Sequence, residues 1–279
     1  MKAKKRFQDN IRFVMLIILS VLFLAPIFIV FMNSFKNRLD IADAPFDFPN
    51  ADTFAGLDNY INGFEKTGFV EAFRYSLQIT VLTVIVIVLF TAMTAWFITR
   101  VKSKFSSALY YLFLFSMIVP FQMVMFTMSK MANMLYLDNP NGLIIVNLGF
   151  GSGIAVFMYC GFVKGIPLEI EEAATIDGCN PIQTFFKIVF PILKPVSFTV
   201  AILTTMWAWN DYLLPFLVIG SNYNTIPIAV QKYLQGGYGN KDMGAMMAML
   251  VLAIIPIMAF YLSCQKYIIK GVTAGAVKG

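Results

Sequence analysis

Six long apolar runs limit what this chain can fold into. Each run is about 20 residues long, which is the length of α-helix that crosses a hydrocarbon core of about 30 Å. The runs cover Phe13–Met32, Ser76–Thr99, Ala108–Thr127, Leu143–Phe162, Val196–Phe216 and Met243–Cys264. The sequence lacks the alternating strands, roughly ten residues each, of a membrane β-barrel, so helices are the structure that can satisfy its backbone in lipid. We therefore predict an all-α integral membrane protein in which residues 1–279 form one domain with six transmembrane helices.

The distribution of charge excludes a soluble globular domain. Apolar residues make up 59% of the chain and charged residues 13%, whereas soluble proteins average about 45–50% and about 25%. Every Lys, Arg, Asp and Glu except Asp211 lies outside the six apolar runs. This placement is expected in a membrane protein, because a charge in the hydrocarbon core costs several kcal/mol.

Several classes of chemistry lack their usual residues. The chain has no His, and Cys160, Cys179 and Cys264 show no C-x-x-C spacing, so we assign no catalytic residue, metal ligand or disulfide framework. No phosphate-binding GxxxxGK[ST] loop occurs, so if the protein uses ATP, a partner chain must bind the ATP and its Mg²⁺. The net charge of +6 is not gathered into a basic stripe with interleaved aromatics, which argues against nucleic acid as a partner.

Lys and Arg are unevenly divided between alternate connecting segments. The segments on the side of the N-terminus hold 14 of them, and those on the other side hold seven. Because positively charged segments are retained in the cytoplasm, we predict that both termini are cytoplasmic. The start MKAKKR also resembles a secretory signal. The apolar run that follows lacks an A-x-A-type cleavage site, so we expect a retained first span.

The predicted cytoplasmic segment 164–195 carries the strongest local signals. Pro167 suits the first position of a short helix, and Gly178 follows its end, where a left-handed residue is needed. Asn180 is expected to cap a second helix with Gln183 at its third position. The exposed Ala173–Ala174 face of the first helix could enter a groove on another protein. An ordinary loop with two interfacial helices fits the same pattern.

This segment resembles the EAA signature of ATP-binding-cassette (ABC) importer permeases, EAA-x3-G-x9-I-x-L-P. The match consists of Glu172-Ala173-Ala174, Gly178 and Ile188–Pro191, with Phe190 where the signature has Leu. The resemblance implies a coupling loop whose first helix sits in a cleft of a cytoplasmic ATPase. The residues that it assigns to this coupling are Glu171, Glu172, Ala173, Ala174, Asp177, Gly178 and Pro191.

Four further stretches are similar to the shorter, six-span permease of maltose-type carbohydrate importers. They are Phe35–Asn37, Leu57–Tyr60, Trp209–Tyr212 and Lys270–Gly279. This resemblance implies the type I ABC-importer permease fold in the cytoplasmic membrane of a prokaryote, surrounded by lipid. It also implies a heterodimer with a second homologous permease, two cytoplasmic ATPase subunits and an extracytoplasmic solute-binding protein. The solute would be a mono- or oligosaccharide.

The cytoplasmic tail 265–279 contains too much glycine to form a stable helix by itself. The family resemblance implies that it reaches between the two ATPase subunits, where close backbone approach favours glycine. The tail residues assigned to this contact are Lys270, Gly271, Gly275 and Gly279.

A solute path through the membrane needs polar or aromatic side chains that face the bundle interior. We assign to it Gln122, Trp209, Asn210, Asp211 and Tyr212. Two other roles stay open for Asp211: it could reach water at the outer interface, or it could serve a gate or the fold. A non-sugar solute such as glycerol phosphate also stays open. An ion-coupled secondary transporter is disfavoured, because Asp211 is the one titratable carboxylate in a span.

Overall fold

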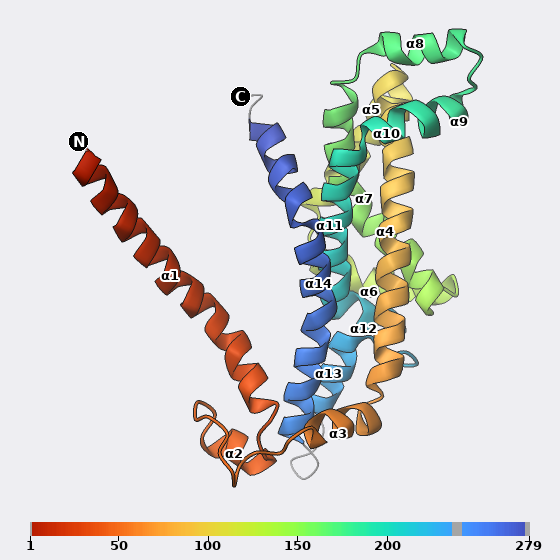
Figure 1. Ribbon diagram of the computed structural model, residues 1–279. Helices are drawn as coiled ribbons and strands as arrows, with labels where there is room; N and C mark the ends of the chain where they lie inside the picture. The colour runs from red at the N-terminus through yellow and green to blue at the C-terminus, as the bar shows by residue number, and fades with distance from the viewer. Residues whose placement is uncertain (1, 236–241, 277–279) are drawn as a thin grey trace. The chain divides into compact units, whose positions relative to one another are not determined.

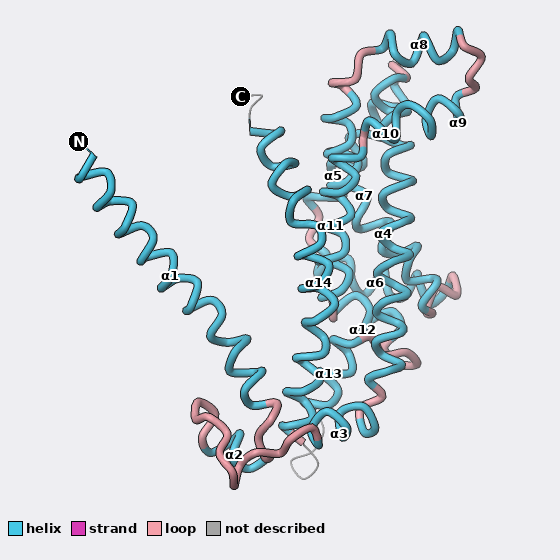
Figure 2. Tube along the Cα trace, viewed as in Figure 1, coloured by secondary structure: helices cyan, strands magenta, loops and turns pink. Residues whose placement is uncertain are grey.

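The prediction of an all-α fold is confirmed. A computed structural model describes residues 2–235 and 242–276, and over these residues the regular elements are helices (Figure 1 and Figure 2). The elements are α1 (Lys2–Asn33), α2 (Arg38–Asp43), α3 (Asp58–Lys66), α4 (Phe69–Arg100), α5 (Lys104–Ile118), α6 (Phe121–Met134), α7 (Pro140–Val163), α8 (Leu168–Ile176), α9 (Pro181–Thr184), a π-helical turn (Phe185–Val189), α10 (Phe190–Ile192), α11 (Lys194–Asn210), α12 (Leu213–Ile219), α13 (Ile226–Gln235) and α14 (Met243–Ala276).

Within the described residues, four helical stretches are long and apolar enough to cross a membrane unaided. They are Gln8–Asn33, Phe69–Arg100, Pro140–Val163 and Met243–Gln265. Two bent helix pairs raise the number of candidate spans to six if each pair is one broken span. The first pair is α5 with α6, and the second is Pro181–Ile192 with Lys194–Asn210, which bends by 78° at Leu193, before the predicted run 196–216. The six predicted runs fall on helices, and the runs 108–127 and 196–216 are each interrupted by a break of their own.

The predicted helix over residues 108–127 is broken. The axes of α5 and α6 differ in direction by 109°. Val119 adopts an extended conformation with φ −74° and ψ 113°, because the ring of Pro120 disfavours helical geometry in the preceding residue. Pro120 then stands as the N-cap of α6, where a missing N–H costs nothing. The sequence around Pro120 therefore turns a candidate span into a corner.

The predicted helix over residues 196–216 is also interrupted, at the one charged residue within the six runs. The helix α11 ends at Asn210, and Asp211 is extended with φ −71° and ψ 125°. The Leu214 N–H of α12 donates to Asp211 Oδ1 at 3.5 Å. The Asp211 carboxylate therefore lies beside the first turn of α12, whose N-cap is Tyr212, and it accepts one of the free N–H groups of that turn.

The chain divides into two compact units. In the unit built from Glu71–Ile228 and the residues from Pro256 onward, α4, α7 and α11 pack around one apolar core. Its fully buried side chains include Ile87, Val156, Tyr159 and Val189. The α8–α9 segment lies at one end of this group of helices (Figure 1). The core therefore connects the segment with the EAA-like sequence to the helices that carry the predicted solute path.

The other unit consists of the residues up to Val70 and of Ala229–Ile255. Within it, hydrogen bonds connect the stretches Phe35–Asn37 and Leu57–Tyr60. The Ala55 N–H donates to Phe35 O at 2.8 Å. Asn59 Nδ2 donates to Ser34 O and to Lys36 O, each at 2.8 Å. The FKN motif around Lys36 and the LDNY motif that contains Asn59 thus hold each other in place, and their role in this unit is structural.

Candidate functional site

The local structure of the coupling segment follows its sequence closely. The helix α8 begins at Leu168, one residue after Pro167, which serves as its N-cap. Gly178 has φ +80°, the left-handed conformation that glycine adopts without strain. The Asn180 side chain accepts from the Gln183 N–H at 2.9 Å, and Gln183 Oε1 accepts from the Asn180 N–H at 3.0 Å. These reciprocal bonds fix the turn between α8 and α9.

The predicted coupling residues divide into an exposed set and a buried set. The exposed residues are Glu172, Ala173, Asp177, Gly178 and Pro191. Glu171 and Ala174, in contrast, keep only 7% and 6% of their surface accessible. The helix α8 also exposes Ile176 at 86%. One face of α8 is therefore a small acidic and apolar surface, and the opposite face packs on this chain.

Glu171 is buried because it pairs with the end of α4. Arg100 Nη2 and Nε donate to Glu171 Oε1 at 2.7 and 2.9 Å. Trp96 Nε1 donates to Glu171 Oε2 at 2.9 Å, and Arg100 Nη2 also donates to Ile166 O at 2.9 Å. Neither Arg100 nor Trp96 was among the residues assigned from the sequence, because no local pattern relates them to a glutamate 71 and 75 positions away.

The segment after α8 joins the core. Phe185 and Val189 are 1% and 0% exposed, and the Phe185 ring lies 5.6 Å from that of Trp96, centroid to centroid. Ile182 and Phe186, from the same segment, are exposed at 67% and 46%. The apolar side chains at 182, 185, 186 and 189 are therefore half buried and half exposed along a stretch that contains the π-helical turn Phe185–Val189.

A cavity of about 480 Å³ brings two of the predicted path residues together. Gln122 and Asp211 line it with Ser116, and Trp207 supplies an indole ring. Among the described residues that line this cavity, Asp211 is the one that carries a charge. A carboxylate, an amide and a hydroxyl beside an aromatic ring can hydrogen-bond and stack with a sugar. In the described part of the chain, no group of three His, Cys, Asp or Glu residues could hold a metal ion.

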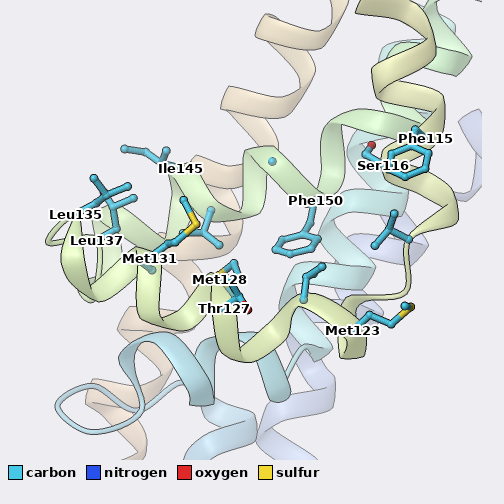
Figure 3. A pocket seen from close by; sticks show the side chains of 15 residues that line it. Phe115, Ser116, Met123, Thr127, Met128, Met131, Leu135, Leu137, Ile145 and Phe150 are labelled. Carbon is cyan, nitrogen blue, oxygen red and sulfur yellow. The ribbon is translucent and has the colours of Figure 1, made fainter.

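A second cavity, of about 690 Å³, opens on the concave side of the corner between α5 and α6 (Figure 3). Phe115, Met128 and Leu135 line it with other apolar side chains. Ser116 and Phe150 border both cavities. Its lining offers few groups that could bind a sugar hydroxyl, so we place the candidate path in the smaller, more polar cavity.

Three other predicted path residues do not line the polar cavity. Trp209 is 6% exposed and meets the Phe73 ring edge to face at 5.9 Å. Asn210 Nδ2 donates to Met206 O at 2.7 Å, within its own helix. Tyr212 stacks on Phe216 at 5.1 Å. Sequence proximity to Asp211 suggests these residues. Trp209 and Asn210 lie on α11, where consecutive side chains point about 100° apart, and Tyr212 follows the break, so the three side chains diverge from Asp211.

The predicted tail residues Lys270, Gly271 and Gly275 lie within α14, which continues to Ala276. The expectation that glycine prevents a helix in this stretch is therefore not met up to that residue. Gly279 lies outside the described residues.

Comparison with known proteins identifies the family. The family model described as "Binding-protein-dependent transport system inner membrane component" matches residues 87–274. The chain is 38% identical to the "Probable starch degradation products transport system permease protein AmyC" of Thermoanaerobacterium thermosulfurigenes, over 94% of each chain. It is 36% identical to the "Multiple sugar-binding transport system permease protein MsmG" of Streptococcus mutans, over 100% of each.

The fold has a counterpart among solved structures. A bacterial ABC transporter that imports the acidic polysaccharide alginate contains a chain that superposes with a TM-score of 0.81 at 21% identity. The match covers 95% of this chain and 97% of that one. The protein described here belongs to the family of binding-protein-dependent transport system inner membrane components.

Proposed function

We propose that this permease carries a mono- or oligosaccharide across the cytoplasmic membrane as the membrane subunit of an ABC importer. The observation that carries the proposal is the coupling segment, where α8 exposes Glu172 and Ala173 ahead of the left-handed Gly178. Relatives named for starch degradation products, for multiple sugars and for melibiose, raffinose and stachyose support a carbohydrate as the solute.

The partners are those that membership of the binding-protein-dependent transport family implies. The sequence contains no phosphate loop, so two cytoplasmic ATPase subunits would bind ATP and Mg²⁺ and carry out the hydrolysis. A second, homologous permease would complete the path as a heterodimer, and an extracytoplasmic binding protein would deliver the sugar. In this arrangement the permease is a transport subunit and not an enzyme.

The helix α11 provides a route from the coupling segment to the polar cavity. It begins at Lys194, after a bend of 78° at Leu193 that follows α10, and ends at Asn210, directly before Asp211. A rigid helix transmits displacement along its length, and alternating access needs such rigid elements between two discrete arrangements. Closure of the ATPases would displace α8 and, through α11, change the access to the cavity from one side of the membrane to the other.

The chemistry of the polar cavity favours a neutral sugar over glycerol phosphate. The Asp211 carboxylate would repel a phosphate, whereas it can accept hydrogen bonds from sugar hydroxyls. Gln122 can both donate and accept, and the Trp207 ring offers an apolar face. An ion-coupled transporter would have to use Asp211 as its coupling site, since it is the one carboxylate within the six apolar runs.

Uptake by the complete complex in liposomes tests this proposal. We expect uptake of a radiolabelled starch-derived oligosaccharide or raffinose to require ATP on the ATPase side and to persist when ionophores collapse the ion gradients. Uptake that follows an ion gradient without ATP would contradict the proposal.

A charge reversal on α8 tests the proposed docking of this helix on the ATPase. Glu172→Lys reverses an exposed charge at the proposed contact, so we expect several-fold less ATPase to co-purify with the membrane subunits. Glu65→Lys reverses another exposed glutamate, on a segment predicted to be extracytoplasmic, and is expected to leave ATPase binding unchanged. Equal ATPase recovery with both variants would remove Glu172 from the contact.

A further inference from the structure

A buried ion pair joins the proposed docking helix to the end of a membrane helix. Its members are Glu171 on α8 and Arg100 at the last position of α4, whose side chains are 9% and 19% exposed. Trp96, one turn earlier on α4, donates to the second carboxylate oxygen of Glu171. We call Trp96, Arg100 and Glu171 the α8 anchor.

The α8 anchor satisfies both oxygens of the carboxylate. Oε1 accepts two bonds from Arg100, and Oε2 accepts one from Trp96. A guanidinium presents its N–H groups in a fixed planar fork, so this geometry constrains direction as well as distance. A buried charge that loses its partner is strongly destabilising. Separating α8 from α4 would leave both mostly buried charges without a partner, so the pair opposes that separation.

The anchor also fixes the start of the segment. Arg100 Nη2 donates to the carbonyl of Ile166, just before Pro167 and the first turn of α8. The Trp96 ring packs on Phe185, which follows α9. The end of α4 thus contacts the coupling segment at three places: Ile166 before α8, Glu171 within α8, and Phe185 after α9.

Glu171 and Glu172 have opposite environments on one helix. Consecutive residues of an α-helix point about 100° apart, so Glu171 faces α4 while Glu172 is exposed. The two residues could therefore divide two tasks: Glu172 contacts the ATPase, and Glu171 ties the contacted helix to the membrane bundle.

We propose that Arg100 and Trp96 are positioning residues for energy coupling: they make α8 move as one body with α4, so that ATPase closure displaces α4 directly. The inference rests on the proposed docking of an ATPase at α8. Displacement of α4 would be a second way, beside α11, in which ATPase movement reaches the interior of the helix bundle. Asn147 Nδ2 of α7 donates to Thr83 Oγ1 of α4 at 3.1 Å in a buried contact, so a displacement of α4 reaches α7.

The test compares single and paired charge changes in the complete reconstituted complex. Glu171→Gln and Arg100→Gln each remove one charge of the anchor, and Arg100→Glu combined with Glu171→Arg restores a pair with reversed polarity. We expect the ATPase to co-purify with both single variants, while sugar taken up per ATP hydrolysed falls about tenfold, within the roughly 5–150-fold range of couplings between sites. The double exchange restores the ion pair but not the bonds to Trp96 and to the Ile166 carbonyl, so it should recover only part of that ratio, above either single variant.

Glu169→Gln is the matched control. It removes an exposed carboxylate from the first turn of the same helix and should leave the ratio of uptake to hydrolysis unchanged. An unchanged ratio in both Glu171→Gln and Arg100→Gln would overturn the inference. Loss of ATPase binding in Glu171→Gln, as with Glu172→Lys, would also overturn it, because Glu171 would then belong to the docking contact. Neither result bears on whether uptake requires ATP, which is the separate test of the proposed function.

A spectroscopic measurement separates positioning from folding. Nitroxide labels on cysteines replacing Lys102 and Thr175, both exposed, report the distance between the end of α4 and α8 in a background without native cysteines. We expect a narrow distance distribution in the assembled complex and a broad one with Glu171→Gln. Equally narrow distributions would show that α8 is held without the anchor and would refute the inference.

Discussion

Asp211 combines two roles at a single position. Its Oδ1 accepts from the Leu214 N–H at 3.5 Å, and its residue borders the polar cavity with Gln122. The long bond is a weak cap, so the start of α12 does not consume the carboxylate. The Asp211 carboxylate therefore lies both at the helix break and at the edge of the polar cavity.

Substitutions of Asp211 distinguish a solute contact from an ion site. Asp211→Asn keeps the shape and part of the hydrogen bonding but removes the charge, whereas Asp211→Leu removes both. If Asp211 contacts the sugar, we expect the Asn variant to retain more uptake than the Leu variant, with ATP hydrolysis preserved in both. Equal loss in both would indicate that the charge itself is required, as at an ion-coupling site. Normal uptake in both variants would remove Asp211 from the path.

The coupling residues show which part of a site can be read from a sequence. Gly178 and the Asn180–Gln183 capping box depend on neighbours within four positions, and their predicted conformations are those observed. The difference between Glu171 and Glu172 depends on Arg100, 71 residues away. Local rules cannot supply that partner, because many folds could bring one of several cations to the same glutamate.

At the scale of elements, α5 packs on α7 through a glycine. A Cβ atom on Gly153 would lie 2.6 Å from Ser116 Oγ, 2.8 Å from Met117 Cγ and 2.9 Å from Phe113 O. Such distances are below van der Waals contact, and one of the three atoms is backbone. Small residues at helix interfaces allow this close approach in membranes, so Gly153 sets the spacing on which both cavities depend.

Gly153→Ala should therefore be destabilising. We expect a cost of about 1–3 kcal/mol, because the added methyl group overpacks the interface. Gly161→Ala on the same helix is the control: its Cβ would meet nothing within 4 Å, and it should be neutral or stabilising by up to about 1 kcal/mol through helix propensity. Thermal unfolding of the detergent-purified complex measures both. Equal unfolding temperatures for the two variants would contradict the assigned role of Gly153.

The broken helices mark the limit of prediction at this scale. Apolar length correctly located helices in all six runs, because lipid demands an internally bonded backbone. The same criterion takes no account of Pro120, at which α5 and α6 form a corner of 109°. Whether a proline bends or breaks a span depends on the packing of neighbouring helices on the freed carbonyls, which the sequence does not show.

At the scale of the whole molecule, the proposed mechanism requires one orientation in the membrane. The ATPase can reach α8 only if residues 164–195 are cytoplasmic. If the six predicted runs are six crossings, both termini lie on the same side of the membrane as this segment. The bias of 14 Lys and Arg residues against seven favours the same orientation on independent electrostatic grounds.

Single cysteines in a variant without Cys160, Cys179 and Cys264 test this orientation. Cysteines replacing Asp52 and Ser221, both exposed, should react with a membrane-impermeant thiol reagent added outside intact cells. A cysteine replacing Thr175 should react only after the membrane is opened. The reverse pattern would place α8 outside the cell and rule out ATPase docking there. If the cysteines at positions 52 and 221 were instead labelled from opposite sides, the chain would cross the membrane an odd number of times between them. The bent pair α5–α6 would then be a re-entrant corner and not a span.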